Sequence, residues 1–156
     1  MIVAGIDPGA NGAIAIIDSK RNVFMVADMP KDNKTFVDII KNNRYKPDKV
    51  YMESVHALPN QSTVAGFTFG KNVGKAELLA ESMGEVVLVH PSKWKLFMGL
   101  ERKKSESKTD YKHRSVYMAK EMFSECSDCL KISKDGRAEA LLIAAYGIAM
   151  EDGMPY

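Results

Sequence analysis

Four acidic residues occupy positions from which a folded chain could bring them together. Asp7 and Glu53 each end a short apolar run, whereas Asp135 and Glu139 begin a segment that is apolar almost throughout. Four converging carboxylates would repel one another and raise each other's pKa unless cations lay between them. Carboxylate oxygens suit Mg²⁺ or Mn²⁺, and two such ions about 4 Å apart can clamp a phosphodiester for attack by water.

Each of these acids also has a simpler interpretation when it is taken alone. Asp7 precedes Pro8-Gly9 and can act as a turn former. Asp135 can be a helix N-cap, and Glu139 can be a favourable acid in the first turn of a helix. Residues four apart share one face of a helix, however, so Asp135 and Glu139 can point the same way. The four acids together favour a common site over separate local roles.

The first half of the chain indicates how Asp7 and Glu53 would be positioned. Ile2–Asp7 and Ala13–Asp18 predict an antiparallel hairpin joined by the turn residues 8–12, and residues 22–29 predict a third strand. The run Lys49–Glu53 follows a short amphipathic helix, and such a crossover favours parallel pairing with the first strand. Both acids would then lie at the same edge of the sheet.

The second half alternates helices with one further strand. We expect a long helix from Thr63 to about Ser82, a strand over 85–90, a short helix from Ser92 and a helix over 109–123. A final helix begins near Asp135. The order of elements predicts an α/β fold, and without repeats or linkers we expect residues 1–156 to form a single domain.

Three glycines recur at intervals of four within the long predicted helix. Gly66, Gly70 and Gly74 share one face, and each costs a helix about 1 kcal/mol relative to alanine. Close approach of another element, a second subunit or a polyanion backbone would explain them. The sequence leaves these explanations open.

Basic residues are concentrated in one part of the chain, although the net charge is only +2. Residues 91–120 hold nine basic and three acidic side chains, which gives this segment a charge of +6. A segment of this kind is either a solvated lysine-rich surface or a contact site for a polyanion such as nucleic acid.

The remaining composition is that of an ordinary globular protein. Hydrophobic residues make up 46% and charged residues 27% of the sequence, and neither a signal peptide nor a membrane span fits the interrupted apolar start. We therefore expect a cytoplasmic protein. The lone pair Cys126 and Cys129 lacks a second cysteine pair for zinc, so free, structurally incidental thiols are expected.

Three segments resemble the RuvC family of Holliday-junction resolvases in the RNase H-like superfamily, and in particular its short, phage-type members. The segments are Gly5-Ile6-Asp7-Pro8-Gly9, Tyr51-Met52-Glu53-Ser54 and Asp135 to Ala144. The resemblance implies a five-stranded mixed sheet with its first three strands antiparallel, a homodimer, and Mg²⁺-dependent nicking of branched DNA such as four-way junctions. A phage-encoded member would act in the host cytoplasm.

The resemblance also assigns roles by position. It implies that Asp7, Glu53, Asp135 and Glu139 hold two Mg²⁺ ions per site, with Mn²⁺ able to substitute. The family usually has its two helix ligands three residues apart, whereas here Gly136 stands three before Glu139 and the acid is Asp135. Some members place an aromatic wedge three residues after the strand glutamate, where this chain has His56.

Eleven further residues are candidates for DNA contact. Stacking at the junction centre could come from His56, Phe67 or Phe69, and the sequence does not choose among them. The basic candidates for phosphate contact are Lys71, Lys93, Lys95, Arg102, Lys103, Lys104, Lys108 and Arg137.

Other functions remain open from the sequence. A different RNase H-like nuclease, such as a ribonuclease for RNA–DNA hybrids, would use the same carboxylates. From a different class, the protein could be a module that recognises junctions without cutting them. The glycine-rich hairpin after Asp7 also occurs in sugar-kinase and actin-like ATPases, but those need a second, duplicated half and a longer chain.

Overall fold

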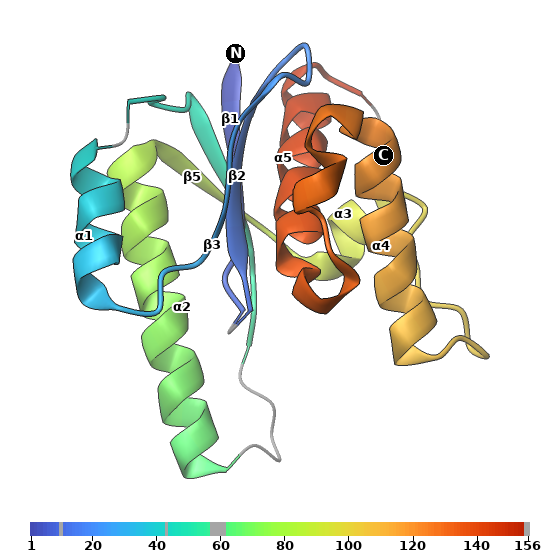
Figure 1. The fold of residues 1–156 in the computed structure, drawn as a ribbon, viewed down its shortest axis with the longest axis horizontal. Coiled ribbons are helices and arrows are strands. Elements are labelled where there is room, and N and C mark those ends of the chain that lie inside the picture. The colour runs from blue at the N-terminus through green and yellow to red at the C-terminus, as the bar shows by residue number, and fades with distance from the viewer. Residues whose placement is uncertain (10, 43, 57–61, 155–156) are drawn as a thin grey trace.

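The computed structural model describes residues 1–9, 11–42, 44–56 and 62–154 and contains a five-stranded mixed sheet between two layers of helices (Figure 1). The strand order is β3-β2-β1-β4-β5, so β1 is central. The strands are β1 (Ile2–Asp7), β2 (Ala13–Asp18), β3 (Val23–Asp28), β4 (Lys49–Glu53) and β5 (Glu85–Val89).

Strand pairing explains how two acids reach the same edge. The first three strands are antiparallel, with Asp7 opposite Ala13 in the β1–β2 pair. β4 pairs parallel to β1, with Met52 opposite Ile6, and β5 pairs parallel to β4. The carboxyl ends of β1, β4 and β5 therefore lie at one edge of the sheet, which confirms the predicted sheet.

The helices divide between the two faces of the sheet (Figure 1). Helices α1 and α2 cover one face, and α3, α4 and α5 cover the other. The bounds are α1 (Asn33–Asn42), α2 (Thr63–Met83), α3 (Pro91–Phe97), α4 (Lys108–Met122) and α5 (Gly136–Glu151), with 3₁₀ turns η1 (Ser124–Cys129) and η2 (Ile132–Lys134) before α5.

Helix α5 is the most deeply buried helix of the described chain and packs on β1 and β2. Twelve of its sixteen residues are buried, which is why its sequence is apolar on nearly every side. A Cβ at Gly5 in β1 would overlap the carbonyl oxygen of Ala140 and lie 2.5 Å from the nitrogen of Ala144. The glycine therefore allows the helix backbone to lie directly against the central strand, which fixes the start of α5 beside the end of β1.

Helix α2 is packed over only part of its length. Its C-terminal half is held on the sheet by Ala76, Leu79, Ala80 and Met83. Its N-terminal half begins at Ser62, whose side chain caps the helix, and runs beyond the body of the molecule (Figure 1). Val64 and Phe67 are 78% and 75% exposed there. This end of α2 has little contact with the rest of the described chain.

Two expectations from the sequence have a direct outcome, and a third lies partly outside the described residues. Cys126 and Cys129 are free thiols in η1, as expected. Within the described ranges no helix is long and apolar enough to cross a membrane. The expected loop over 54–61 is described only as far as His56, and residues 57–61 lie outside the described residues.

Candidate metal centre

The carboxylate of Asp7 lies at the end of β1, where the chain enters the Pro8-Gly9 turn. Its Oδ1 accepts a hydrogen bond of 3.0 Å from the backbone N–H of Gly9. A Cβ at Gly136, the first residue of α5, would lie 3.1 Å from its Oδ2. Asp7 is thus a turn-forming residue, and its second oxygen also faces the start of α5, so the two interpretations of this residue are compatible.

Glu53 ends the neighbouring parallel strand and is buried, with 8% of its surface exposed. Its Oε2 accepts a hydrogen bond of 2.8 Å from the indole N–H of Trp94, which is fully buried in α3. A charge-assisted bond of this kind holds a carboxylate in one orientation. The short helix that follows β5 therefore positions the glutamate that ends β4.

Asp135 and Glu139 enter the site from the start of α5. Asp135 stands at the N-cap position, but its side chain accepts no capping hydrogen bond and instead pairs with Lys112 of α4, Oδ2 to Nζ, at 2.8 Å. Glu139 lies in the first turn, and its Oε1 is 3.6 Å from the Nζ of Lys95. Asp135 therefore does not act as a side-chain cap in this structure.

The pKa values of Asp7 and Glu139 are affected by the charges of the neighbouring acids. Burial raises the pKa of Asp7 to about 6 against the Gly9 hydrogen bond, and the charges of Glu53 and Asp135 raise it further. Burial also raises the pKa of Glu139 to about 7; Lys95 opposes this, and Asp7, Glu53 and Asp135 add to it. A group of acids that disfavours its own ionisation attracts cations.

Two lysines lie among these acids, at positions that have no clear signal in the sequence. Burial lowers the pKa of the Lys95 ammonium, but the charges of Glu139 and Glu53 outweigh it and leave the pKa above its ordinary value. The ammonium also lies 4.9 Å from the centre of the Trp94 ring. The hydrogen bond to Asp135 raises the pKa of Lys112. The sequence predicts Lys95 as a DNA contact and predicts no role in the site for Lys112 or Trp94.

The first residue of α5 explains the unusual spacing of its acids. A Cβ at Gly136 would overlap the carbonyl oxygen of Asn11 in the turn after β1. A side chain three residues before Glu139 therefore has no room where the turn lies against the helix. The acid of this chain stands one residue earlier, at Asp135, where its side chain reaches Lys112.

The donor set fits a hard divalent cation in chemical type. All four side chains are carboxylates, and three backbone elements carry them to one edge of the sheet. In the described part of the chain, no three acidic, histidine or cysteine side chains lie close enough together to hold one ion. Lys95 and Lys112 instead supply the positive charge next to Glu139 and Asp135, so ligation would require these pairs to open.

The candidate DNA contacts fall into two groups. Most are exposed, namely His56, Phe67, Lys71, Lys93, Arg102, Lys103, Lys104 and Lys108, and Phe69 is half-buried. Lys95 lies inside the acidic site instead. Arg137 pairs with Asp28 at 2.6 Å and donates to the carbonyl of Cys129. These two cations are thus already engaged within the chain.

The loop that carries Arg102, Lys103 and Lys104 is tied to α4 by one arginine. Arg114 pairs with Glu106 at 2.6 Å and donates to the carbonyl oxygens of Gly99 and Glu101. The three exposed cations of this loop are thereby held on the same side of the molecule as α4. Lys112, in the same helix, reaches the acidic site.

Comparisons with known proteins give matches by structure. No model of a known protein family matches the sequence. A search of curated proteins also finds no match. The fold is similar to Thermus thermophilus RuvC in complex with Holliday junction substrate, with a TM-score of 0.64 and 15% identity over 98% of this chain and 97% of that chain.

Two further solved structures give the same result. A second structure of Thermus thermophilus RuvC has a TM-score of 0.64 and 17% identity, over 98% of this chain and 97% of that one. The fowlpox virus Holliday junction resolvase has a TM-score of 0.59 and 18% identity, over 96% of this chain and 99% of that one. The chain therefore has the RuvC fold, an RNase H-like architecture, as the motifs predict.

Proposed function

We propose that this protein is a metal-dependent endonuclease that nicks Holliday junctions and other branched DNA. The observation that carries the proposal is the set of four carboxylates brought to one sheet edge by β1, β4 and α5, in a chain that has the RuvC fold. Structural neighbours that are junction resolvases favour a DNA substrate over an RNA–DNA hybrid.

Asp7, Glu53, Asp135 and Glu139 are the proposed ligands of two Mg²⁺ ions. When bound, such ions supply a nucleophilic water at neutral pH and Lewis-acid stabilisation of the leaving oxygen. Trp94 holds Glu53 in place through its indole N–H. Lys95 and Lys112 offset the negative charge of Glu139 and Asp135. When DNA binds, the two lysines can leave these carboxylates and pair with a DNA phosphate instead.

The proposed working form is a homodimer, since a four-way junction has two strands to cut. The exposed N-terminal half of α2 supports this proposal. Val64 and Phe67 are large apolar side chains in water there, and nothing in the described chain lies within 4 Å of a Cβ placed at Gly66, Gly70 or Gly74. Packing within the described chain therefore does not explain these glycines, and a second subunit or DNA would.

The test is cleavage of a synthetic four-way junction with mapped nick positions, beside a plain duplex and an RNA–DNA hybrid, in Mg²⁺ and in Mn²⁺. We expect symmetric nicks in the junction. Asp7→Asn and Glu53→Gln keep the shape of each side chain and an acceptor for Gly9 or Trp94. Each should lower the cleavage rate by about 1,000-fold or more, about 4 kcal/mol of transition-state stabilisation.

Junction binding separates the alternatives. Both variants should bind the junction at least as tightly as wild type when EDTA removes divalent metal, because each has one negative charge fewer to repel DNA. A wild-type protein that binds junctions and never nicks them in either metal would be a binding module, and the nuclease proposal would be wrong. Preferential cutting of the hybrid would assign the same carboxylates to a ribonuclease.

A further inference from the structure

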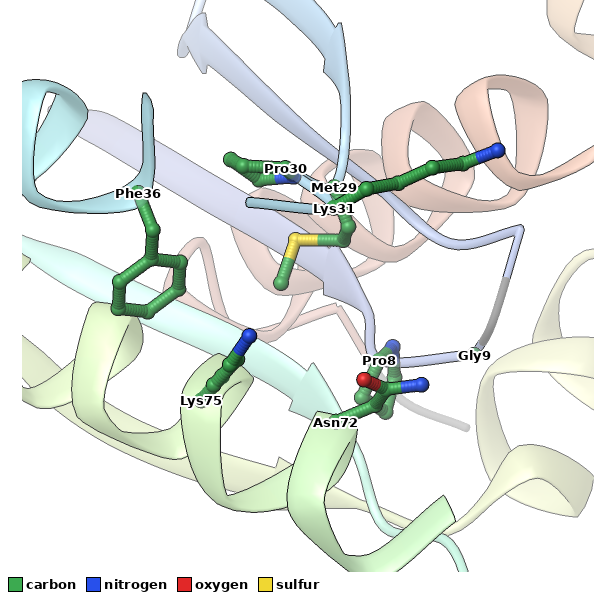
Figure 2. A pocket seen from close by; sticks show the side chains of 8 residues that line it. All are labelled: Pro8, Gly9, Met29, Pro30, Lys31, Phe36, Asn72 and Lys75. Carbon is green, nitrogen blue, oxygen red and sulfur yellow. The ribbon is translucent and has the colours of Figure 1, made fainter. Parts of the chain in front are cut away.

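A hollow lies beside the acidic site, on the opposite face of the sheet edge. Its volume is about 250 Å³, and it is enclosed by the Pro8-Gly9 turn, residues 29–31, Phe36 of α1 and the middle of α2. Figure 2 shows Asn72 and Lys75 rising from α2 toward Met29 and Pro30, with Pro8 at one end. None of the four carboxylates lines this hollow.

The Pro8-Gly9 turn is common to the two sites. Gly9 lines the hollow, and its backbone N–H donates to Oδ1 of Asp7. The carboxylate of Asp7 faces α5, whereas the hollow opens between the turn and α2. A DNA strand that crosses the carboxyl end of β1 would therefore contact the acids on one side of the Pro8-Gly9 turn and this hollow on the other side.

The polar groups of the hollow are cations and an amide. Lys75 and Lys31 carry its charge, and within the described residues neither forms an ion pair. In Figure 2 the Lys75 ammonium points from α2 toward Met29, whereas the exposed Lys31 side chain extends away from Lys75. Asn72 adds an amide donor next to Pro8 (Figure 2). Lys75 is half-buried, so its ammonium is less free to turn toward bulk water than that of a fully exposed lysine. Such an arrangement suits an anion with several oxygen acceptors.

The rest of the lining is apolar. Phe36 is almost fully buried and forms part of the lining, and the side chains of Met29 and Pro30 lie above the α2 residues in Figure 2. Apolar and cationic groups together match one nucleotide unit, in which a phosphate adjoins a deoxyribose and a base. An isolated inorganic anion would make no favourable contact with the apolar lining.

We propose that this hollow is a second phosphate-binding subsite, which holds a phosphodiester and its adjoining sugar close to the scissile phosphate on the same DNA strand. The inference rests on the proposed function, because it takes the acidic site as the place of cleavage. Lys75 and Asn72 bind the phosphate from α2, and the exposed side chain of Lys31 turns toward it from the rim of the hollow. The two cations thereby offset the repulsion that four carboxylates exert on DNA, before the scissile phosphate is in place.

The first test is junction binding in EDTA, where cleavage is absent. The double variant K31A/K75A should lower affinity by about ten-fold and reduce the slope of log affinity against log salt by about one, since one phosphate contact is lost. The matched control is K20A/K41A, which removes two exposed lysines, one from the β2–β3 turn and one from the end of α1. An equal loss in both double variants would mean that only net charge matters, and it would overturn the subsite.

The second test locates the phosphate. Junctions with one neutral methylphosphonate at each position within about three nucleotides of the mapped nick are titrated against wild type and K31A/K75A. One position should weaken wild-type binding and leave the variant unaffected. Losses that are equal in both proteins at every position would overturn the inference.

The outcomes separate this inference from the proposed function. A wild-type protein that does not bind or cut junctions contradicts the proposed function itself. A wild-type protein that cuts junctions while K31A/K75A binds and cuts as well as wild type contradicts only the subsite. Saturable binding of thymidine 5′-monophosphate that requires Lys31 and Lys75, with no change in junction affinity, would assign the hollow to a free nucleotide and also overturn the DNA contact.

Discussion

Helices α5 and α2 both carry glycines, but the glycines have opposite surroundings. In α5, a Cβ at Gly136 would overlap the backbone of Asn11, and one at Gly147 would overlap the Tyr51 ring. In α2, a Cβ at Gly66, Gly70 or Gly74 would meet no atom of the described chain within 4 Å. The first set is explained by contacts within the chain, and the second is not.

The contrast shows which of the two helices is packed fully by contacts within the described chain. The α5 side is closed by the chain itself, and the tight backbone contacts there hold Asp135 and Glu139 next to Asp7. The N-terminal half of α2 is apolar, exposed and rich in glycine, which is unfavourable for an isolated helix. The candidate metal site is thus supported by packing within the chain, whereas the N-terminal half of α2 has no such support from the described residues.

The largest expected effect tests the closed side. Gly5→Ala should lower the free energy of unfolding by about 3 kcal/mol or more, because the new methyl group would overlap the backbone of α5 and neither backbone can move independently. Urea unfolding followed by circular dichroism measures the change. A loss below about 0.5 kcal/mol would show that α5 does not lie tightly on β1.

The second prediction concerns the cost of gathering acids at this side. The pKa of Asp7 is raised in the fold to about 6, so the folded protein holds a proton more tightly than the unfolded chain. Stability from this group is fully present below about pH 4 and is lost as the pH rises through about 6, a loss of up to about 3 kcal/mol. The pKa of Glu139 is raised to about 7, so its contribution to stability is also lost as the pH rises.

Thermal unfolding in EDTA between about pH 5 and pH 8 measures this loss. Asp7→Asn should flatten the profile and raise stability at the higher pH. Added Mg²⁺ should stabilise wild type more than Asp7→Asn at about pH 8. A wild-type profile that rises with pH across this window would contradict the shared acidic environment.

The third prediction tests the open helix. Gly70→Ala should raise the free energy of unfolding of the single subunit by about 0.5 to 1 kcal/mol, since alanine favours the helix and meets no neighbour. Dilute samples, followed by thermal unfolding, isolate this effect. Destabilisation at every protein concentration would mean that this face packs within the chain, and the contrast with α5 would disappear.

The smallest effect on stability is expected at Phe67, which is 75% exposed. Phe67→Ser should leave unfolding of the single subunit within about 0.5 kcal/mol of wild type. If α2 joins two subunits, the variant should weaken self-association by about ten-fold or more in sedimentation experiments, as truncating a central aromatic does at interfaces. Unchanged association would place the interface elsewhere.

The sequence was sufficient to predict the sheet, its antiparallel start and the RuvC fold. Apolar runs that end in Asp7 and Glu53 mark the strand ends, and the helix that precedes the second run favours parallel pairing. These signals are local, or depend only on the order of elements. The roles of the four carboxylates as metal ligands and of the basic residues as DNA contacts stay predictions.

Several features of the site depend on contacts between distant residues and had no local signal. Arg137 pairs with Asp28, and Lys112 pairs with Asp135. Trp94 of α3 donates a hydrogen bond to Glu53 of β4. The position of Trp94 could have been anticipated, because a helix that directly follows β5 begins at the same sheet edge as Asp7 and Glu53. The pocket between the Pro8-Gly9 turn and α2 follows from packing and could not have been read from spacing.

The hydrogen bond between Trp94 and Glu53 has a practical consequence. Trp94 is the one tryptophan in the sequence, and its ring is buried with its indole N–H on a candidate ligand and the Lys95 ammonium near its face. Tryptophan emission depends on nearby charge, so the intrinsic fluorescence of the unlabelled protein reports directly on this site. Titration of Mg²⁺ or of junction DNA can therefore be followed optically without introducing any probe into the molecule.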